Sequence, residues 1–204
     1  MPLTPEEGRE AVTLARHSLE AHVRGETMPP VPGTSGVFGE LRGVFVTLNL
    51  LEGEEKLRGC IGFPYPTYPL GRAIREATAA AASEDPRFPP VAPGELESIV
   101  VEVSVLTPPS EIAAKDRRTL PSKVRVGTDG LIVSNAFTSG LLLPQVATEF
   151  GLDATDFLSQ TCLKAGLPPD AWLDNDTKVQ VFQAEIFAEA KPHGEVSKVT
   201  PRGR

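Results

Sequence analysis

The segment GVFVTLNLLEGEEKLRGCIGF, residues 43–63, contains two apolar runs separated by the polar stretch EGEE. The first run, residues 44–51, is dense in β-branched and large apolar side chains, which favour strands. The second run continues through LRGCIG, residues 57–62. The pattern therefore predicts two strands joined by a turn at EGEE.

The residues around this segment predict two helices and a further strand. Residues 4–25 begin with Thr4 as N-cap and Glu7 as its capping-box partner, and Gly25 ends the apolar stripe. Residues 69–84 are rich in alanine and predict a helix that packs closely on a sheet. Residues 97–106, ESIVVEVSVL, predict a strand that is buried on at least one side.

The second half of the chain mixes the same two kinds of element. Residues 124–135, VRVGTDGLIVSN, predict a hairpin around Thr-Asp-Gly. A helix is predicted to start near Pro144, another to run from Asp153 to Gly166, and an alternating strand to cover residues 178–189. Because strands and helices alternate irregularly, the fold class we predict is α+β.

Composition limits the kinds of partner. The net charge of the chain is −7. Residues 191–204 hold four of the 20 basic residues and only one of the 27 acidic residues, so residues 1–190 carry a net charge of −10. An acidic body repels phosphate backbones, so we expect no nucleic-acid binding, and residues 191–204 read as a flexible basic tail. No apolar run approaches the ~18 residues of a membrane span, and two cysteines make no disulfide framework. We expect a reduced cytoplasmic protein that does not bind membranes.

Cys60, between two glycines and just after Arg58, is the candidate reactive group. In an extended strand Arg58, Cys60 and Gly62 would share one face, where a cation would favour the thiolate, and Gly59 would lie on the other. The alternative is that Cys60 is a small buried filler and that the glycines allow close packing. Cys162, on the apolar side of a predicted helix, is expected in the core. The sequence has no zinc-ligand spacing, Walker loop or GxGxxG motif, so we predict no metal and no cofactor.

The stretch DPRF, residues 85–88, is the second candidate. Two roles are open to Arg87. It either holds the loop by bonding a carboxylate or carbonyl, or it faces a cleft, where its planar guanidinium suits a carboxylate or phosphate. We include Asp85 and Phe88 with it, and Gln145, which either points into the same cleft or caps a helix.

Seven segments together carry a family resemblance: GVFVTL, LRGCIG, PLGRAI, DPRFPPV, ELESIVVEVSVLTP, GLLLPQVATE and QTCLKAGLPPDAW. Their order and spacing resemble the AMMECR-domain family over residues 8–190, and LRGCIG is the most specific of them. The resemblance implies two lobes, a larger mixed or antiparallel sheet with flanking helices and a smaller sheet-containing lobe, with a cleft near LRGCIG. Prokaryotic members resemble protein A of the AmmeMemoRadiSam system, which implies a Memo-like protein and a radical SAM enzyme as partners.

Two functions stay open at this point. One is a module that binds a small anion, another small ligand, a peptide or a partner protein, favoured because no general base or cofactor motif accompanies Cys60. The other is an enzyme or enzyme component in which Cys60 is the nucleophile or covalent attachment point and Arg58 or Arg87 orients an anionic substrate. The family's molecular activity is not established, so the resemblance does not choose between them.

Overall fold

The computed structural model describes residues 2–32, 36–52 and 54–199. Gly53, in the predicted turn EGEE, lies outside the described residues. The α-helices, 3-10 helices (η) and strands follow one another as α1 (Pro5–Arg24), η1 (Val37–Gly39), β1 (Val44–Glu52), β2 (Glu54–Phe63), α2 (Leu70–Ser83), η2 (Pro93–Ser98), β3 (Ile99–Leu106), β4 (Ser110–Glu111), η3 (Arg117–Lys123), β5 (Gly130–Ser134), β6 (Ser139–Leu142), α3 (Pro144–Glu149), α4 (Ala154–Lys164), η4 (Ala171–Leu173), β7 (Lys178–Phe182), β8 (Ala184–Glu189) and β9 (Val196–Val199).

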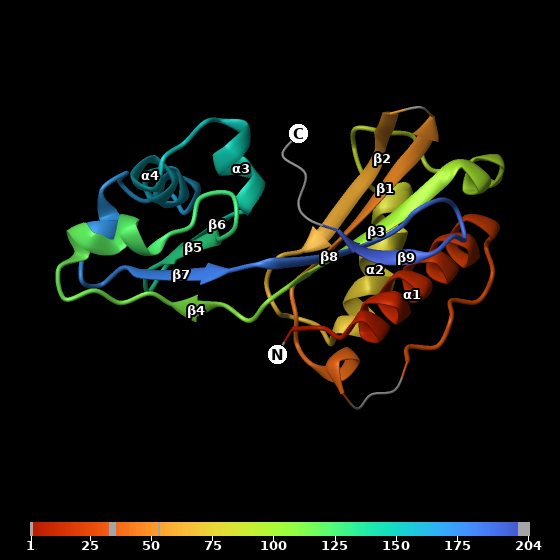
Figure 1. The fold of residues 1–204 in the computed structure, drawn as a ribbon, viewed down its shortest axis with the longest axis horizontal. Helices are drawn as coiled ribbons and strands as arrows, with labels where there is room; N and C mark the ends of the chain where they lie inside the picture. The colour runs from red at the N-terminus through yellow and green to blue at the C-terminus, as the bar shows by residue number, and fades with distance from the viewer. Residues whose placement is uncertain (1, 33–35, 53, 200–204) are drawn as a thin grey trace. The chain divides into compact units, whose positions relative to one another are not determined.

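The chain forms two compact units, and each contains one sheet. The first unit takes in residues 2–107 and 185–199 and holds a five-stranded sheet in the order β2-β1-β3-β8-β9. The second unit, residues 108–184, holds a four-stranded sheet in the order β4-β7-β5-β6. Helices and mainly antiparallel strands therefore coexist in an α+β fold, as the sequence predicts (Figure 1).

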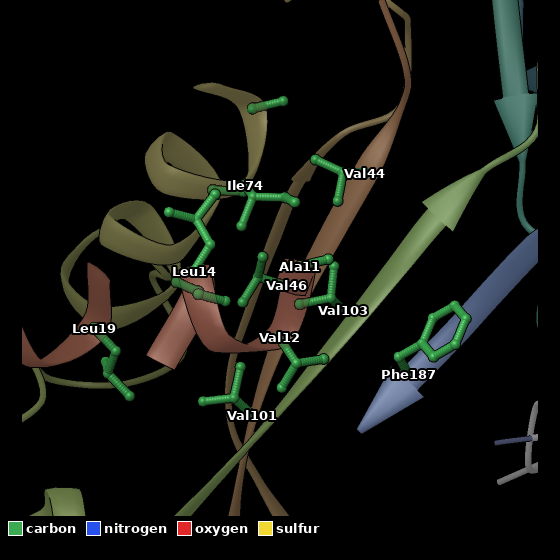
Figure 2. Close-up of a cluster of buried hydrophobic side chains, with 14 of the residues drawn as sticks. Ala11, Val12, Leu14, Leu19, Val44, Val46, Ile74, Val101, Val103 and Phe187 are labelled. Carbon is green, nitrogen blue, oxygen red and sulfur yellow. The ribbon is translucent and has the colours of Figure 1, made fainter. Parts of the chain in front are cut away.

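One face of the five-stranded sheet packs on α1 and α2. Every second residue of β1 and β3 enters this core, so that Val46 of β1 lies opposite Val103 of β3. Figure 2 shows these valines beside apolar side chains of α1, Ile74 of α2 and Phe187 of β8. The alternate positions of both strands lie on the other face of the sheet, where polar residues such as Thr47 and Glu102 are mixed with apolar ones such as Phe45.

Helix α1 begins and ends where its capping residues predict. The Thr4 hydroxyl accepts the N–H of Glu7, the Glu7 carboxylate accepts the N–H of Thr4, and Gly25 takes a left-handed conformation at φ 70°. Arg16 ties the middle of the helix to β8 through a buried ion pair with Glu189. Within the described residues no helix, α1 included, is long and apolar enough to cross a membrane.

The second unit has a core of its own between its sheet and α4. Leu131 and Val133 of β5 pack with Phe157, Leu158 and Trp172. Asp153 caps α4 by accepting the N–H groups of the first turn. Cys162 is fully buried here, and burial raises the pKa of its thiol, so it behaves as a core residue as predicted.

The predicted hairpin at residues 124–135 is wrong in its position. The hairpin pairs β5 with β6, and its connection is residues 135–138, not Thr-Asp-Gly. Residues 125–129 form turns instead, because the buried Asp129 carboxylate accepts the main-chain N–H and the guanidinium of Arg125. This turn ends within the predicted Thr-Asp-Gly, whose glycine already belongs to β5, and it closes a loop rather than a hairpin.

The predicted flexible tail, residues 191–204, also differs from the structure in part. Val196–Val199 form strand β9, which pairs antiparallel with β8, and Lys198 bonds the Glu185 carboxylate at 2.7 Å. Main-chain pairing and this ion pair hold the segment on the sheet. Residues 200–204 lie outside the described residues.

Candidate functional site

Cys60 lies in β2, at the edge of the five-stranded sheet. Its partner across β1 is Thr47, while its neighbours Gly59 and Ile61 pair with Leu48 and Val46, which belong to the core. Cys60 therefore lies on the sheet face opposite α1 and α2. Its side chain is half-buried, and the Thr47 hydroxyl donates a hydrogen bond to its sulfur at 3.4 Å.

Both main-chain polar groups of Cys60 bond side chains of the loop after α2. The Cys60 N–H donates to Asp85 Oδ2 at 2.8 Å, and the Cys60 carbonyl accepts from Arg87 Nη2 at 3.4 Å. An edge strand normally leaves such groups open to further strand pairing. The side chains of Asp85 and Arg87 thus close this part of the edge and hold the backbone at Cys60 in place.

Asp85 and Arg87 also bond each other. The guanidinium makes a bidentate contact with the carboxylate, Nε to Oδ1 at 2.9 Å and Nη2 to Oδ2 at 2.7 Å. These bonds, with the N–H groups of Cys60 and Arg87, hold the pKa of Asp85 far below its usual range despite its burial. The pKa of Arg87 is raised, first by its hydrogen bonds to Asp85 and to a smaller degree by the charge of that carboxylate.

Arg58 is buried and fully engaged, with 7% of its surface exposed. Its Nε and Nη2 bond the two Glu95 oxygens at 2.7 and 3.0 Å, and it donates to the carbonyls of Pro89 and Pro90. The first cause of the lowered pKa of Glu95 is this hydrogen bonding. Arg58 therefore fastens the loop between α2 and β3 to strand β2.

A β-bulge at Arg58 changes the predicted alternation. The register moves from Leu48 opposite Gly59 to Asn49 opposite Leu57, so Arg58 has no direct partner in β1. Cys60 and Gly62 share one face as predicted, but strict alternation does not extend through Arg58. The Phe88 ring also belongs to this cluster, since it lies 5.9 Å from the Arg58 guanidinium and 5.5 Å from that of Arg87.

The two glycines beside Cys60 are explained by close packing. A Cβ on Gly59 would collide with the Ala81 carbonyl oxygen at the end of α2. A Cβ on Gly62 would collide with the Phe45 ring and the Val44 carbonyl. The first glycine lets α2 approach the strand, and the second makes room for an aromatic side chain on the Cys60 face.

Three polar residues on the Cys60 face were missed in the sequence. Thr47 and Asn49 alternate with core residues along β1, and Glu102 of β3 lies opposite Thr47. Cys60, Thr47 and Glu102 thus form one row across three strands. The period-2 alternation in VFVTLNLL and IVVEVSVL indicates that these polar side chains share the face opposite the core. Only the register between the strands shows that they lie beside Cys60.

Gln145 is distant from this cluster in the sequence. It lies in the first turn of α3, in the second unit, where its carbonyl accepts the Thr148 hydroxyl. Its predicted role in the cleft stays a prediction, as does the cleft itself. Across residues 2–32, 36–52 and 54–199, no group of three or more His, Cys, Asp or Glu side chains lies close enough to hold a metal ion.

The fold and this cluster define a class: an α+β protein in which an LRGCIG edge strand and a DPRF loop bind each other. A model of the AMMECR1 family matches residues 12–187, and the chain belongs to this family. Proteins of Thermococcus onnurineus and Methanothermobacter thermautotrophicus are 54% and 53% identical to it, over 94% and 92% of this chain and 94% and 97% of theirs. The crystal structure of the uncharacterized protein PH0010 from Pyrococcus horikoshii is similar, with a TM-score of 0.79 and 47% identity over 98% of this chain and 99% of that one.

Proposed function

We propose that this chain is a binding module that takes a small ligand or an extended peptide beside Cys60, and that it acts with a Memo-like protein and a radical SAM enzyme. The observation that carries the proposal is the locked backbone of Cys60, whose N–H and carbonyl are both held by Asp85 and Arg87. Binding to a surface that is already ordered loses less conformational freedom than binding to a mobile one. The half-buried thiol is therefore presented from a pre-organised strand.

The engagement of the arginines favours ligands other than a small anion. Arg58 is buried against Glu95 and two carbonyls, and Arg87 directs Nε and Nη2 at Asp85. An anion would have to compete with these carboxylates for the same donors. A neutral ligand or a peptide needs no such exchange.

The positions of the histidines favour binding over catalysis. His22 bonds Ser83 at 3.0 Å, His193 lies 3.4 Å from Glu20, and His17 is on the exposed side of α1. A cysteine nucleophile is commonly activated by an adjacent base. With the three histidines engaged or directed elsewhere, Cys60 has no imidazole partner among the described residues.

The second candidate is an enzyme or enzyme component with Cys60 as nucleophile or covalent attachment point. The half-buried sulfur and its hydrogen bond from Thr47 favour this reading. A Cys60→Ser variant separates the two functions, because serine keeps the size and polarity of the side chain and removes the reactive sulfur. A module keeps its affinity in this variant, whereas covalent chemistry is lost.

The experiment is a titration of the chain against a purified Memo-like protein, before and after N-ethylmaleimide blocks Cys60. We expect binding that Cys60→Ser preserves and that the maleimide weakens about tenfold or more, the loss typical of a central interface group. A matched control puts the same label on exposed Glu10 of α1, as Glu10→Cys in the Cys60→Ser background, and should bind normally. Absent binding, or binding that the maleimide leaves unchanged, refutes the proposal.

A further inference from the structure

One buried side-chain oxygen on the Cys60 face, Asn49 Oδ1, lacks a hydrogen-bond partner among the described residues. Asn49 is 5% exposed, and its Oδ1 is buried and makes no hydrogen bond there. Leaving a buried acceptor unsatisfied is costly, and folded proteins contain few of them. Such an atom beside a candidate site indicates a ligand group that completes it.

The strand pairing explains why the sheet does not satisfy Asn49. Its partners across the sheet are Leu57 of β2 and Val100 of β3, and neither side chain carries a donor. Asn49 follows Thr47 by two residues on the same strand face, and the Thr47 hydroxyl bonds the Cys60 sulfur. The amide, the hydroxyl and the thiol therefore lie on one face of two neighbouring strands.

The atoms on this face point to a ligand that donates hydrogen bonds. Asn49 offers an acceptor, and the carboxylate of Glu102 adds negative charge on the next strand, opposite Thr47. We propose that a ligand N–H group donates to Asn49 Oδ1 while the adjoining part of the ligand lies against Cys60. The ligand class is a neutral or cationic N–H donor, such as a peptide or primary amide. This inference rests on the proposed function, since it names the chemical group that the binding module recognises.

Two alkylating reagents of nearly equal size test the inference. Iodoacetamide carries a primary amide, and iodoacetate carries a carboxylate in its place. With either reagent the thiolate sulfur attacks the methylene carbon, a C–S bond forms, iodide leaves and the thiol proton passes to the buffer. The rate at Cys60 is read from the mass of its peptide, and the ratio of the two rates is divided by that of N-acetylcysteine. Fully buried Cys162 serves as an internal control for unfolding.

We expect Cys60 to prefer iodoacetamide by about threefold to tenfold beyond the free thiol, as one hydrogen bond predicts. Asn49→Leu should abolish this extra preference, whereas Ser104→Ala, on the same face opposite Phe45, should keep it. Because Asn49→Leu removes an unsatisfied polar atom, its melting temperature should equal or exceed that of the wild type. If Asn49→Leu does not fold, Asn49→Ala takes its place.

Four results would overturn the inference: no reaction at Cys60, the free-thiol ratio, a preference for iodoacetate, or a preference that survives the loss of Asn49. Measurements on the wild type decide the first three without any variant. If the ratio equals that of the free thiol, the proposed N–H donor is refuted, but the proposed binding module is not. The binding module fails instead on the maleimide titration, so the two failures are distinguishable.

Discussion

Removing the Arg58 guanidinium should release the loop that covers the Cys60 edge. Arg58→Met keeps much of the apolar stem but leaves Glu95 and the carbonyls of Pro89 and Pro90 without their donor. The Arg58 side chain is 8% exposed and that of Glu95 is 31% exposed, so water reaches only part of the broken pair.

The expected loss is about 3 kcal/mol in the free energy of unfolding, the lower end of the range for breaking a buried ion pair. The lower end applies because the partial exposure of Glu95 lets water replace some of its bonds. Arg72→Met is the matched control. Arg72 pairs with Glu76 on the surface of α2, with side chains 59% and 49% exposed, and should cost less than about 1 kcal/mol.

Urea unfolding followed by circular dichroism measures the loss, and amide hydrogen exchange locates it. Exchange in Arg58→Met should rise first in residues 84–98, because the guanidinium holds this loop to β2. Alkylation of Cys60 should accelerate with it. The reasoning is refuted if Arg58→Met loses no more stability than Arg72→Met, or if exchange rises evenly along the chain.

Two further predictions concern β2 and the loop that bonds it. The pKa of Asp85 is lowered in the folded protein by its bonds to Arg87 and Cys60. The ionised carboxylate therefore stabilises the fold fully above the ordinary aspartate pKa of about 4, and this contribution is lost as the pH falls below that value. A pH series of unfolding midpoints should show this acid loss in the wild type and a smaller one in Asp85→Asn. Gly59→Ala should destabilise the fold by about 1–3 kcal/mol, because its Cβ would collide with the Ala81 carbonyl and α2 would have to move. Thermal unfolding measures this loss, and an unchanged melting temperature would contradict the packing role of the glycine.

Most individual elements could be predicted from the sequence, because their signals are local. The capping residues of α1 lie within one turn of the helix they start, and the alternation in β1 and β3 spans single strands. The hairpin prediction failed at Asp129, where the same local turn chemistry serves a different connection. A turn signal shows where the chain bends, and the pairing of strands further along decides what the bend connects.

The sequence does not predict which of the candidate residues contact one another. For Arg87 the sequence leaves open a carboxylate within the loop or an anion in a cleft, and the structure pairs it with Asp85, while Arg58 pairs with Glu95. Glu95 lies 37 residues from Arg58, and no periodicity links the two. The bulge at Arg58 likewise depends on the register with β1, which a single strand does not contain.

By itself the sequence determined the helices with their caps, the apolar faces of the strands, the α+β class and the presence of a glycine-flanked thiol near an arginine. Those features follow from forces that act within a few residues, namely capping bonds and the alternation of side chains. The tertiary structure alone decided which groups meet: Asp85 and Arg87 bond the backbone of Cys60, and Glu95 bonds Arg58. It also left Asn49 Oδ1 without a hydrogen-bond partner among the described residues. These contacts require strand register and loop closure, which the whole packed unit sets.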